Sequence, residues 1–448
     1  MAEDLETLTA RLLQAARAAG AEAADAIAVA GDSLLIEVRG GALEQAERSE
    51  GVDIGLRVLV GRRQACVSAS DTRDATIAAM AERAVAMARE APEDPWCGLA
   101  APEDLARRWD VAALDLADRE PMPSPDALRD AALAAEAAAL AVPGVSKMDG
   151  AGAGWSSARL HLAATNGFSG GYAHTGHSVQ AVAISGAGTA MERDYAFESR
   201  THRVDLPDPA GTGRLAGERA AARAGAGKPP TGAWPVLYDE RVASGLIGHL
   251  VQAINGIAVA RGASWLKDAM GEPVLPEGID LVEDPFRPRI GGSRPFDAEG
   301  LPCARRALVE NGILKSFVLD LATARQLGLA STGNAGRGTS APPSPAVGNL
   351  ALTPGAVTRD ELLAEMGTGL LVTEFIGASI NPTTGDYSRG ASGFWVENGE
   401  IVRPVNECTV AGNLREMLRT VRPANDALPH RSRLVPSLLV EGLVIAGS

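Results

Sequence analysis

The chain has 448 residues, which is enough for two or three domains that each bury a core. Its formal net charge of −14 disfavours binding to nucleic acid or to an anionic membrane, because both carry negative charge themselves. Hydrophobic residues make up 46% and charged residues 22% of the chain, as in a soluble globular protein rather than a disordered one.

The beginning of the chain is acidic and has no basic segment followed by an apolar one, so it does not resemble a signal peptide. No run of about 18 apolar residues occurs that could cross a membrane. We therefore expect a cytoplasmic protein without a membrane partner. Four cysteines lie far apart with no C-x-x-C spacing and are expected to be free thiols: Cys66, Cys97, Cys303 and Cys408.

Residues 1–110 are predicted to form an N-terminal α/β domain. Leucine and alanine recur at helical spacing over residues 5–19, which indicates an amphipathic helix. Apolar residues alternate over residues 52–58, and the chain then turns at Gly61 into the partner strand of a hairpin. A second amphipathic helix follows and ends near Pro92.

Residues 111–230 are predicted to form a middle α/β domain. Ser124 is placed to cap a helix whose first residue is Pro125. Two strands then meet at Asn166-Gly167, a pair typical of tight β-hairpins. A segment rich in glycine and proline over residues 224–232 marks the boundary with the next domain.

Residues 231–448 are predicted to form a C-terminal domain rich in β-strands and glycine-containing turns, with few helices. The predicted fold class is therefore α+β. Its N-terminal half consists of two small α/β units with mostly antiparallel strands, and the β-rich domain follows.

Three patterns resemble catalytic motifs but are better explained by local structure. Residues 167–171 fit G-x-S-x-G, yet a strand-like segment follows where a nucleophile elbow needs a helix. His174 and His177 are three apart on that strand, so they point to opposite faces and do not suit one metal ion. Asp297 and Glu299 could pair as acid and base, but their segment is predicted to be a turn.

Four stretches of the C-terminal half carry a more specific pattern. The sharpest is residues 365–417, which contain NPTTGDYSRGASGFWVENGE, and the other three are residues 235–266, 294–314 and 321–337. Through these stretches the chain resembles the TldD/PmbA family, and specifically its PmbA branch, also called TldE. The first domain fits the family more loosely, so the resemblance spans nearly the whole chain.

The resemblance implies a component of a zinc metallopeptidase that processes or degrades peptides. In the TldD branch a His-Glu-x-x-x-His helix holds the zinc ion, and that chain pairs with a PmbA-type chain. Two neutral imidazoles bind the metal, a glutamate takes a proton from the bound water, and an open coordination position admits the peptide carbonyl.

The present chain departs from that motif. A helix is predicted after residues 236–238, with Asp239 as its N-cap and Gly256 as its stop. Matching this helix to the motif places Gly248 and Ala253 where the histidines would stand and His249 where the glutamate would stand. Glycine and alanine cannot bind a metal, and His249 is predicted to be a packing or capping residue. These are degenerate metal-motif positions. We assign no catalytic residue, metal ligand or cofactor to this chain, and we expect the zinc in a partner chain.

A glycine-rich loop is predicted over residues 385–399, with Asn398-Gly399 as a hairpin turn. Two roles fit this loop. It could help to bind an extended peptide by strand addition, or it could be a self-contained turn that shapes the fold. The candidates for peptide or subunit contact are Asp386, Tyr387, Ser388, Arg389 and Asn398.

These observations predict the non-metal subunit of a TldD/PmbA-type peptidase, which partners a metal-bearing TldD-like chain and acts on a peptide substrate. One alternative is a free-standing peptide-binding or regulatory protein. Another is a peptidase that is active alone through a site not recognised in the sequence. A homodimer of the isolated chain is also compatible with the sequence.

Overall fold

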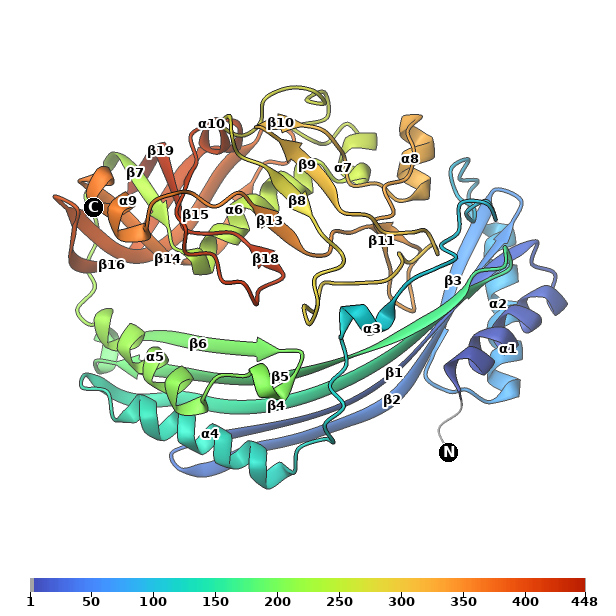
Figure 1. The fold of residues 1–448 in the computed structure, drawn as a ribbon, viewed down its shortest axis with the longest axis horizontal. Helices are drawn as coiled ribbons and strands as arrows, with labels where there is room; N and C mark the ends of the chain where they lie inside the picture. The colour runs from blue at the N-terminus through green and yellow to red at the C-terminus, as the bar shows by residue number, and fades with distance from the viewer. Residues whose placement is uncertain (1–3, 448) are drawn as a thin grey trace.

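The structure is a computed structural model that describes residues 4–447. Its largest element is a curved antiparallel sheet of six strands, and the C-terminal part of the chain lies over the concave side of this sheet (Figure 1). The strand order is β3-β2-β1-β4-β5-β6. The bounds are β1 (Ala23–Arg39), β2 (Ala42–Val60), β3 (Arg63–Ala69), β4 (Val145–Ala164), β5 (Ser169–Ser185) and β6 (Glu192–Arg200).

Both predicted N-terminal units contribute to this one sheet, because β1 pairs with β2 on one side and with β4 on the other. Ala24 and Ala26 of β1 pack with one pair of helices, and Leu34 and Ile36 pack with another pair. Side chains alternate along a strand, so these even-numbered residues put both helix pairs on the same face. The helices are α1 (Leu5–Ala18) and α2 (Asp74–Glu90), then α4 (Pro125–Leu140) and α5 (Pro209–Ala222).

The local signals of the middle domain are confirmed. Ser124 accepts a hydrogen bond from the backbone N–H of Ala127, and Pro125 is the first residue of α4. The Asn166-Gly167 pair lies in the hairpin turn between β4 and β5. Residues 167–171 therefore lead into a strand, so they do not form a nucleophile elbow. A short helix, α3 (Val111–Leu114), precedes α4.

Five strands of the C-terminal domain close into a ring. The order β16-β15-β14-β7-β19 is closed because β16 pairs with β15 and also with β19. Closure removes the free edges that an open sheet would expose. The bounds are β7 (Gly232–Tyr238), β14 (Gly369–Ile380), β15 (Asp386–Glu397), β16 (Glu400–Asn413) and β19 (Leu438–Ala446), with β17 (Arg422–Pro423) added beside β19.

Smaller elements surround this ring. A second sheet has the order β10-β9-β8-β13-β18, and β11 pairs with β12. Its strands are β8 (Leu281–Glu283), β9 (Arg306–Glu310), β10 (Ile313–Leu314), β13 (Leu350–Leu352) and β18 (Arg433–Leu434). The two-stranded pair is β11 (Ala335–Gly336) and β12 (Ser344–Pro345). The helices are α6 (Glu240–Ala253), α7 (Gly256–Ala260), α8 (Leu321–Leu327), α9 (Arg359–Met366) and α10 (Leu414–Arg419).

Helix α6 carries the degenerate motif positions and follows β7 directly. Its N-cap is Asp239, as predicted, and its buried residues include Leu246 and Leu250. The helix ends at Ala253, before the predicted stop at Gly256. The reason is that the side chain of Asn255 accepts a hydrogen bond from the N–H of Ile257 and so caps the next helix, α7.

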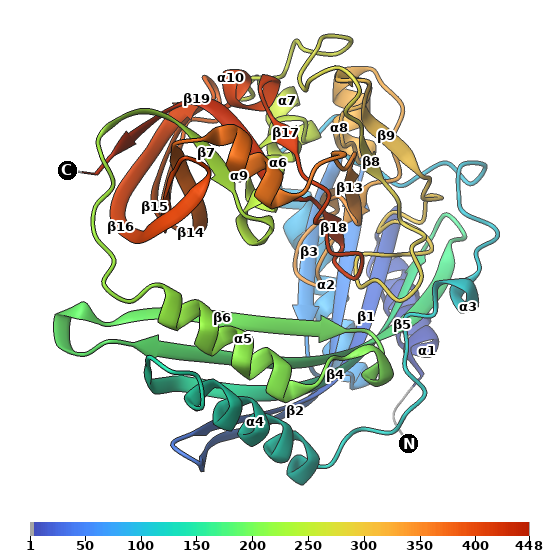
Figure 2. The ribbon, with the colours of Figure 1, turned by 60° about the vertical axis from the view of Figure 1, so that its left-hand side comes forward.

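The C-terminal domain lies over the long sheet (Figure 2), and the two parts of the molecule contact each other at separate places. The residues that line a cleft come from both parts. At one place, Asp25 of β1 pairs with Arg57 of β2 and with Arg337 of the C-terminal domain. We call these three residues the interdomain anchor. At the other place, Asp194 of β6 pairs with Arg241 of α6 at 2.9 Å. Within residues 4–447, no helix is long and apolar enough to cross a membrane.

Candidate functional site

The degenerate motif positions lie on α6 in different surroundings. A Cβ placed on Gly248 would lie 3.2 Å from Nη1 of Arg433 in β18. Ala253 is buried at the end of the helix, and its carbonyl accepts a hydrogen bond from Oγ of Ser264. The ring of His249 meets the ring of Tyr387 edge to face, with centroids 5.8 Å apart. The α6 motif and the glycine-rich segment, distant in sequence, are therefore neighbours.

His249 belongs to a set of packed rings that we call the α6 cluster. The rings of Tyr238 and Phe375 are 5.4 Å apart, and those of Phe375 and Tyr387 are 6.5 Å apart. The guanidinium of Arg389 lies over the Phe375 ring, 4.6 Å from its centroid. The members are Tyr238 of β7, His249 of α6, Phe375 of β14, and Tyr387 and Arg389 of β15.

Burial controls the protonation of this cluster. It raises the pKa of Tyr387 to about 12, and it raises the pKa of Tyr238 as well. Burial also lowers the pKa of His249, and the positive charge of Arg389 lowers it further. At neutral pH we therefore expect neutral tyrosines and a neutral imidazole beside one guanidinium.

A metal ion does not fit this donor set. Gly248 and Ala253 offer no side-chain ligand, and His249 is flanked by an aromatic ring and a cation. Across residues 4–447, no three His, Cys, Asp or Glu side chains form a group that could hold a metal ion. A zinc site needs at least three protein ligands, most of them imidazole, thiolate or carboxylate groups.

The glycine-rich segment, predicted to be a loop, is mainly the central strand β15 between β14 and β16. Its glycines permit close approach of the neighbouring backbone, because a Cβ on Gly393 would lie 1.9 Å from the carbonyl O of Leu371. A Cβ on Gly390 would lie 2.9 Å from the carbonyl O of Ile376. The glycines therefore serve strand pairing here, a role that periodicity alone does not reveal.

The five candidate contact residues divide into three groups along β15. Tyr387 and Arg389 alternate onto the side of α6, whereas Asp386 and Ser388 point to the other side. Asp386 accepts hydrogen bonds from Thr384 and Asn413, which lower its pKa and fix the turn before the strand. Asn398 lies at the opposite end of β15, in the predicted hairpin turn, with a left-handed φ of 52°.

Arg389 has no acidic partner among the described residues. Its Nε donates a hydrogen bond to the carbonyl O of Gly377 at 2.8 Å, and its guanidinium covers Phe375. Gly377 lies in the part of β14 where the pairing with β15 is irregular. The side chain is half-buried and holds this irregular segment without a buried charge pair.

A cleft of about 530 Å³ opens beside α6, between the long sheet and the C-terminal domain. Tyr195 and Phe197 of β6 line one side, and Glu240 and Ser244 of α6 line the other. Burial and the nearby Asp239 carboxylate raise the pKa of Glu240. The sequence did not indicate this cleft, because its walls come from segments that are distant along the chain.

The pair Asp297 and Glu299 forms a turn, as predicted. The Asp297 carboxylate accepts hydrogen bonds from the N–H groups of Glu299, Leu301 and Ala335. Burial and the neighbouring Asp297 raise the pKa of Glu299 to about 8. The turn lies away from α6 and contacts the N-terminus of α8, where Glu299 accepts a hydrogen bond from Leu321.

Comparison with known proteins gives matches along nearly the whole chain. Residues 24–88 match the PmbA/TldA metallopeptidase domain 1, residues 118–224 match the central domain, and residues 231–447 match the C-terminal domain. The Metalloprotease PmbA of Escherichia coli O157:H7 is 35% identical over 413 residues, which cover 92% of this chain and 89% of that protein. The Metalloprotease PmbA homolog of Haemophilus influenzae is 33% identical over 451 residues, which cover 100% of this chain and 97% of that protein.

Solved structures share the fold. A proposed modulator of DNA gyrase from Bacteroides thetaiotaomicron superposes with a TM-score of 0.91 at 25% identity, and the match covers 100% of both chains. TldE from Thermococcus kodakarensis superposes with a TM-score of 0.84 at 21% identity, covering 98% of this chain and 100% of that chain, which shows the fold alone. With three domain matches and full-length relatives above 30% identity, the chain belongs to the PmbA/TldD metallopeptidase family.

Proposed function

We propose that this chain is the subunit of a PmbA/TldD-type metallopeptidase that holds no metal of its own. In this proposal it partners a TldD-like chain whose His-Glu-x-x-x-His helix holds zinc, and the complex processes or degrades peptides. The cytoplasmic location expected from the sequence remains a prediction.

The observation that carries the proposal is the charge around α6. Arg433 stands beside Gly248, and Arg389 stands close enough to His249 to lower its pKa. A divalent cation placed here would meet two guanidinium groups and a single imidazole. Arg433 is exposed, so water weakens its repulsion of a cation, whereas Arg389 is half-buried and repels a cation more strongly. This arrangement disfavours metal binding.

The strand pair β14–β15 supports a role in contact with the partner chain or the peptide. Ile376 lies directly opposite Gly390, and its side chain is 66% exposed. Tyr387 and Arg389, both members of the α6 cluster, contact this segment: Tyr387 packs on Phe375, and Arg389 donates a hydrogen bond to Gly377. Ile376 is therefore an exposed aliphatic side chain that a partner chain or a peptide could cover.

The test compares the purified chain alone with the chain co-purified with a TldD-like paralogue from the same genome. We expect the isolated chain, after mild chelation and dialysis against zinc, to retain far less than one zinc ion per chain and to hydrolyse no peptide. The complex should retain zinc and hydrolyse peptides. A paralogue whose motif glutamate is replaced by glutamine is the control, since it should assemble without hydrolysing peptides.

Each alternative function has its own outcome in this test. Peptide hydrolysis by the isolated chain would favour a peptidase that is active alone. Peptide binding by the isolated chain, with no complex formed and no effect on the paralogue, would favour a free-standing binding protein. Stoichiometric zinc retained through His249 would contradict the proposal directly.

A further inference from the structure

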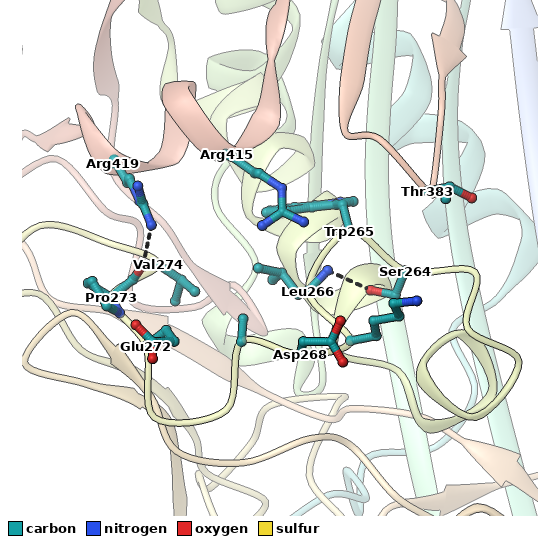
Figure 3. A pocket seen from close by; sticks show the side chains of 12 residues that line it. Ser264, Trp265, Leu266, Asp268, Glu272, Pro273, Val274, Thr383, Arg415 and Arg419 are labelled. Carbon is teal, nitrogen blue, oxygen red and sulfur yellow. Dashed lines mark hydrogen bonds between the residues drawn. The ribbon is translucent and has the colours of Figure 1, made fainter.

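A second cavity lies beside the turn that joins β14 and β15. Its volume is about 230 Å³, and its lining includes Trp265, which is 3% exposed (Figure 3). The backbone N–H of Trp265 donates a hydrogen bond to the carbonyl O of Pro382 in that turn. The neighbouring Ser264 donates its hydroxyl hydrogen to the carbonyl of Ala253, at the end of α6. Hydrogen bonds therefore connect this side of the cavity to the turn and to the end of α6.

The charged groups of this cavity are arranged on two sides. Arg415 and Arg419 reach in from α10, and Asp268 and Glu272 rise from the loop across from them (Figure 3). Lys267 also lines the cavity. Arg415 lies 5.7 Å from the centroid of the Trp265 ring, and Arg419 donates a hydrogen bond to the carbonyl of Pro273.

All five of these charged residues are exposed, and none of them forms an ion pair within residues 4–447. Opposite charges that face one another without pairing leave both sides available to a ligand. An anion alone would be attracted by the arginines and repelled by the carboxylates, and a cation alone would experience the reverse. A small molecule with both charges satisfies both walls at once.

We propose that this cavity binds a small zwitterion of the amino-acid class, either a free amino acid or an unblocked dipeptide. The ligand carboxylate would pair with Arg415 and Arg419, and its ammonium group would donate to Asp268 and Glu272. The volume suits such a ligand, because pockets for drug-sized molecules begin at roughly 300 Å³. The site is separate from the α6 cluster and does not depend on the proposed partnership with a zinc-bearing chain.

Isothermal titration calorimetry on the full isolated chain tests this proposal with L-alanyl-L-leucine and L-leucine as probes. N-acetyl-alanyl-leucine lacks the ammonium group, and alanyl-leucine amide lacks the carboxylate. We expect at least one of the two unblocked probes to bind. If the unblocked dipeptide binds, each blocked dipeptide should bind at least about tenfold more weakly. Tighter binding of L-leucine would identify the ligand as a free amino acid, and tighter binding of L-alanyl-L-leucine would identify it as a dipeptide.

Variants locate the binding. The double variant Arg415→Gln/Arg419→Gln should weaken binding of the unblocked dipeptide until it binds no better than the dipeptide amide. The double variant Asp268→Asn/Glu272→Gln should weaken binding of the unblocked dipeptide until it binds no better than the acetylated dipeptide. Arg305→Gln and Glu400→Gln, which alter charged residues outside the cavity, should leave binding unchanged. Circular dichroism checks that each variant is folded.

Three outcomes would overturn the proposal. One is that neither unblocked probe binds to the folded chain. Another is that blocked and unblocked dipeptides bind equally well. The third is that the cavity variants, once shown to be folded, bind the probes as the unaltered chain does, since the ligand would then occupy another place.

Discussion

The interdomain anchor and the α6 cluster both enclose arginine side chains, but they compensate the positive charge in different ways. In the anchor, Asp25 accepts from Arg57 and Arg337, and all three side chains are at most 5% exposed. In the α6 cluster, Arg389 has an aromatic face and a backbone carbonyl but no acid among the described residues. The anchor therefore depends on every one of its charges, whereas the cluster tolerates the loss of its single charge.

This difference matches what each region does. The anchor fixes the C-terminal domain to the long sheet through residues that lie 312 positions apart in the chain. The α6 cluster instead places beside the degenerate motif a guanidinium group that has no acidic partner among the described residues. Single substitutions in each region test whether the two arginine environments differ in this way.

The largest effect is expected for Asp25→Asn. Burial acts to raise the pKa of Asp25, but the charges of Arg57 and Arg337 outweigh it and lower that pKa. Removing the carboxylate charge leaves two buried guanidinium groups without an ion-pair partner, at a cost of about 3–5 kcal/mol in the free energy of unfolding. Denaturant titration measures this loss. Glu50→Gln, at an exposed pair on β2, should change stability by less than about 1 kcal/mol.

The same pKa shift predicts how the anchor responds to acid. Because the pKa of Asp25 is lower in the folded state, its carboxylate contributes stability above the ordinary pKa of 3.8, and this contribution is lost as the pH falls through the folded pKa. The Asp25→Asn variant should therefore lose less stability than the unaltered chain when both are acidified. Equal losses would contradict the anchor as described.

A smaller effect is expected for Gly55→Ala, which tests the packing beside the anchor. A Cβ on Gly55 would lie 2.2 Å from the carbonyl O of Thr339, so the C-terminal domain would have to shift. We expect a loss of about 1–3 kcal/mol in denaturant titration. Gly51→Ala on the same strand is the matched control, because its Cβ would meet nothing within 4 Å. Equal stability of the two variants would show that the contact is not tight.

For Arg389→Ala we expect a loss of only about 1–2 kcal/mol, from one hydrogen bond and one cation–π contact. No buried acid would be left unpaired within the described chain, in contrast to the anchor. Under the proposed function, peptide hydrolysis by the complex should fall by more than this stability loss explains. A loss as large as that of Asp25→Asn would make Arg389 a fold-forming residue and remove it from the contact candidates.

The smallest effect concerns His249, whose pKa NMR titration should place below 6.5. Because the pKa of His249 is lower in the folded state than in the unfolded state, the neutral imidazole favours folding above pH 6.5. This contribution to stability is lost as the pH falls through the folded pKa. Arg389→Ala should raise the pKa of His249 without restoring 6.5, because burial is the larger cause. His174, whose pKa is lowered by burial alone, should not respond.

Several features could be predicted from the sequence because they depend on neighbouring residues or on side-chain chemistry. The cap at Ser124, the cap at Asp239 and the hairpin turns at Asn166 and Asn398 involve contacts of only a few residues. That Gly248 and Ala253 carry no ligand atom is equally independent of the fold. The family resemblance also rested on contiguous stretches, and the domain matches confirm it.

Other features were decided by the tertiary structure. The segment after Gly385 became a strand because β14 and β16 pair with its two edges, and its glycines make that close pairing possible. The two N-terminal units share one sheet because β1 pairs on both sides. Such strand pairings, like the approach of Arg433 to α6, join residues that are distant in the sequence. Local patterns do not predict them, because the stabilising contacts form only when distant segments pack together.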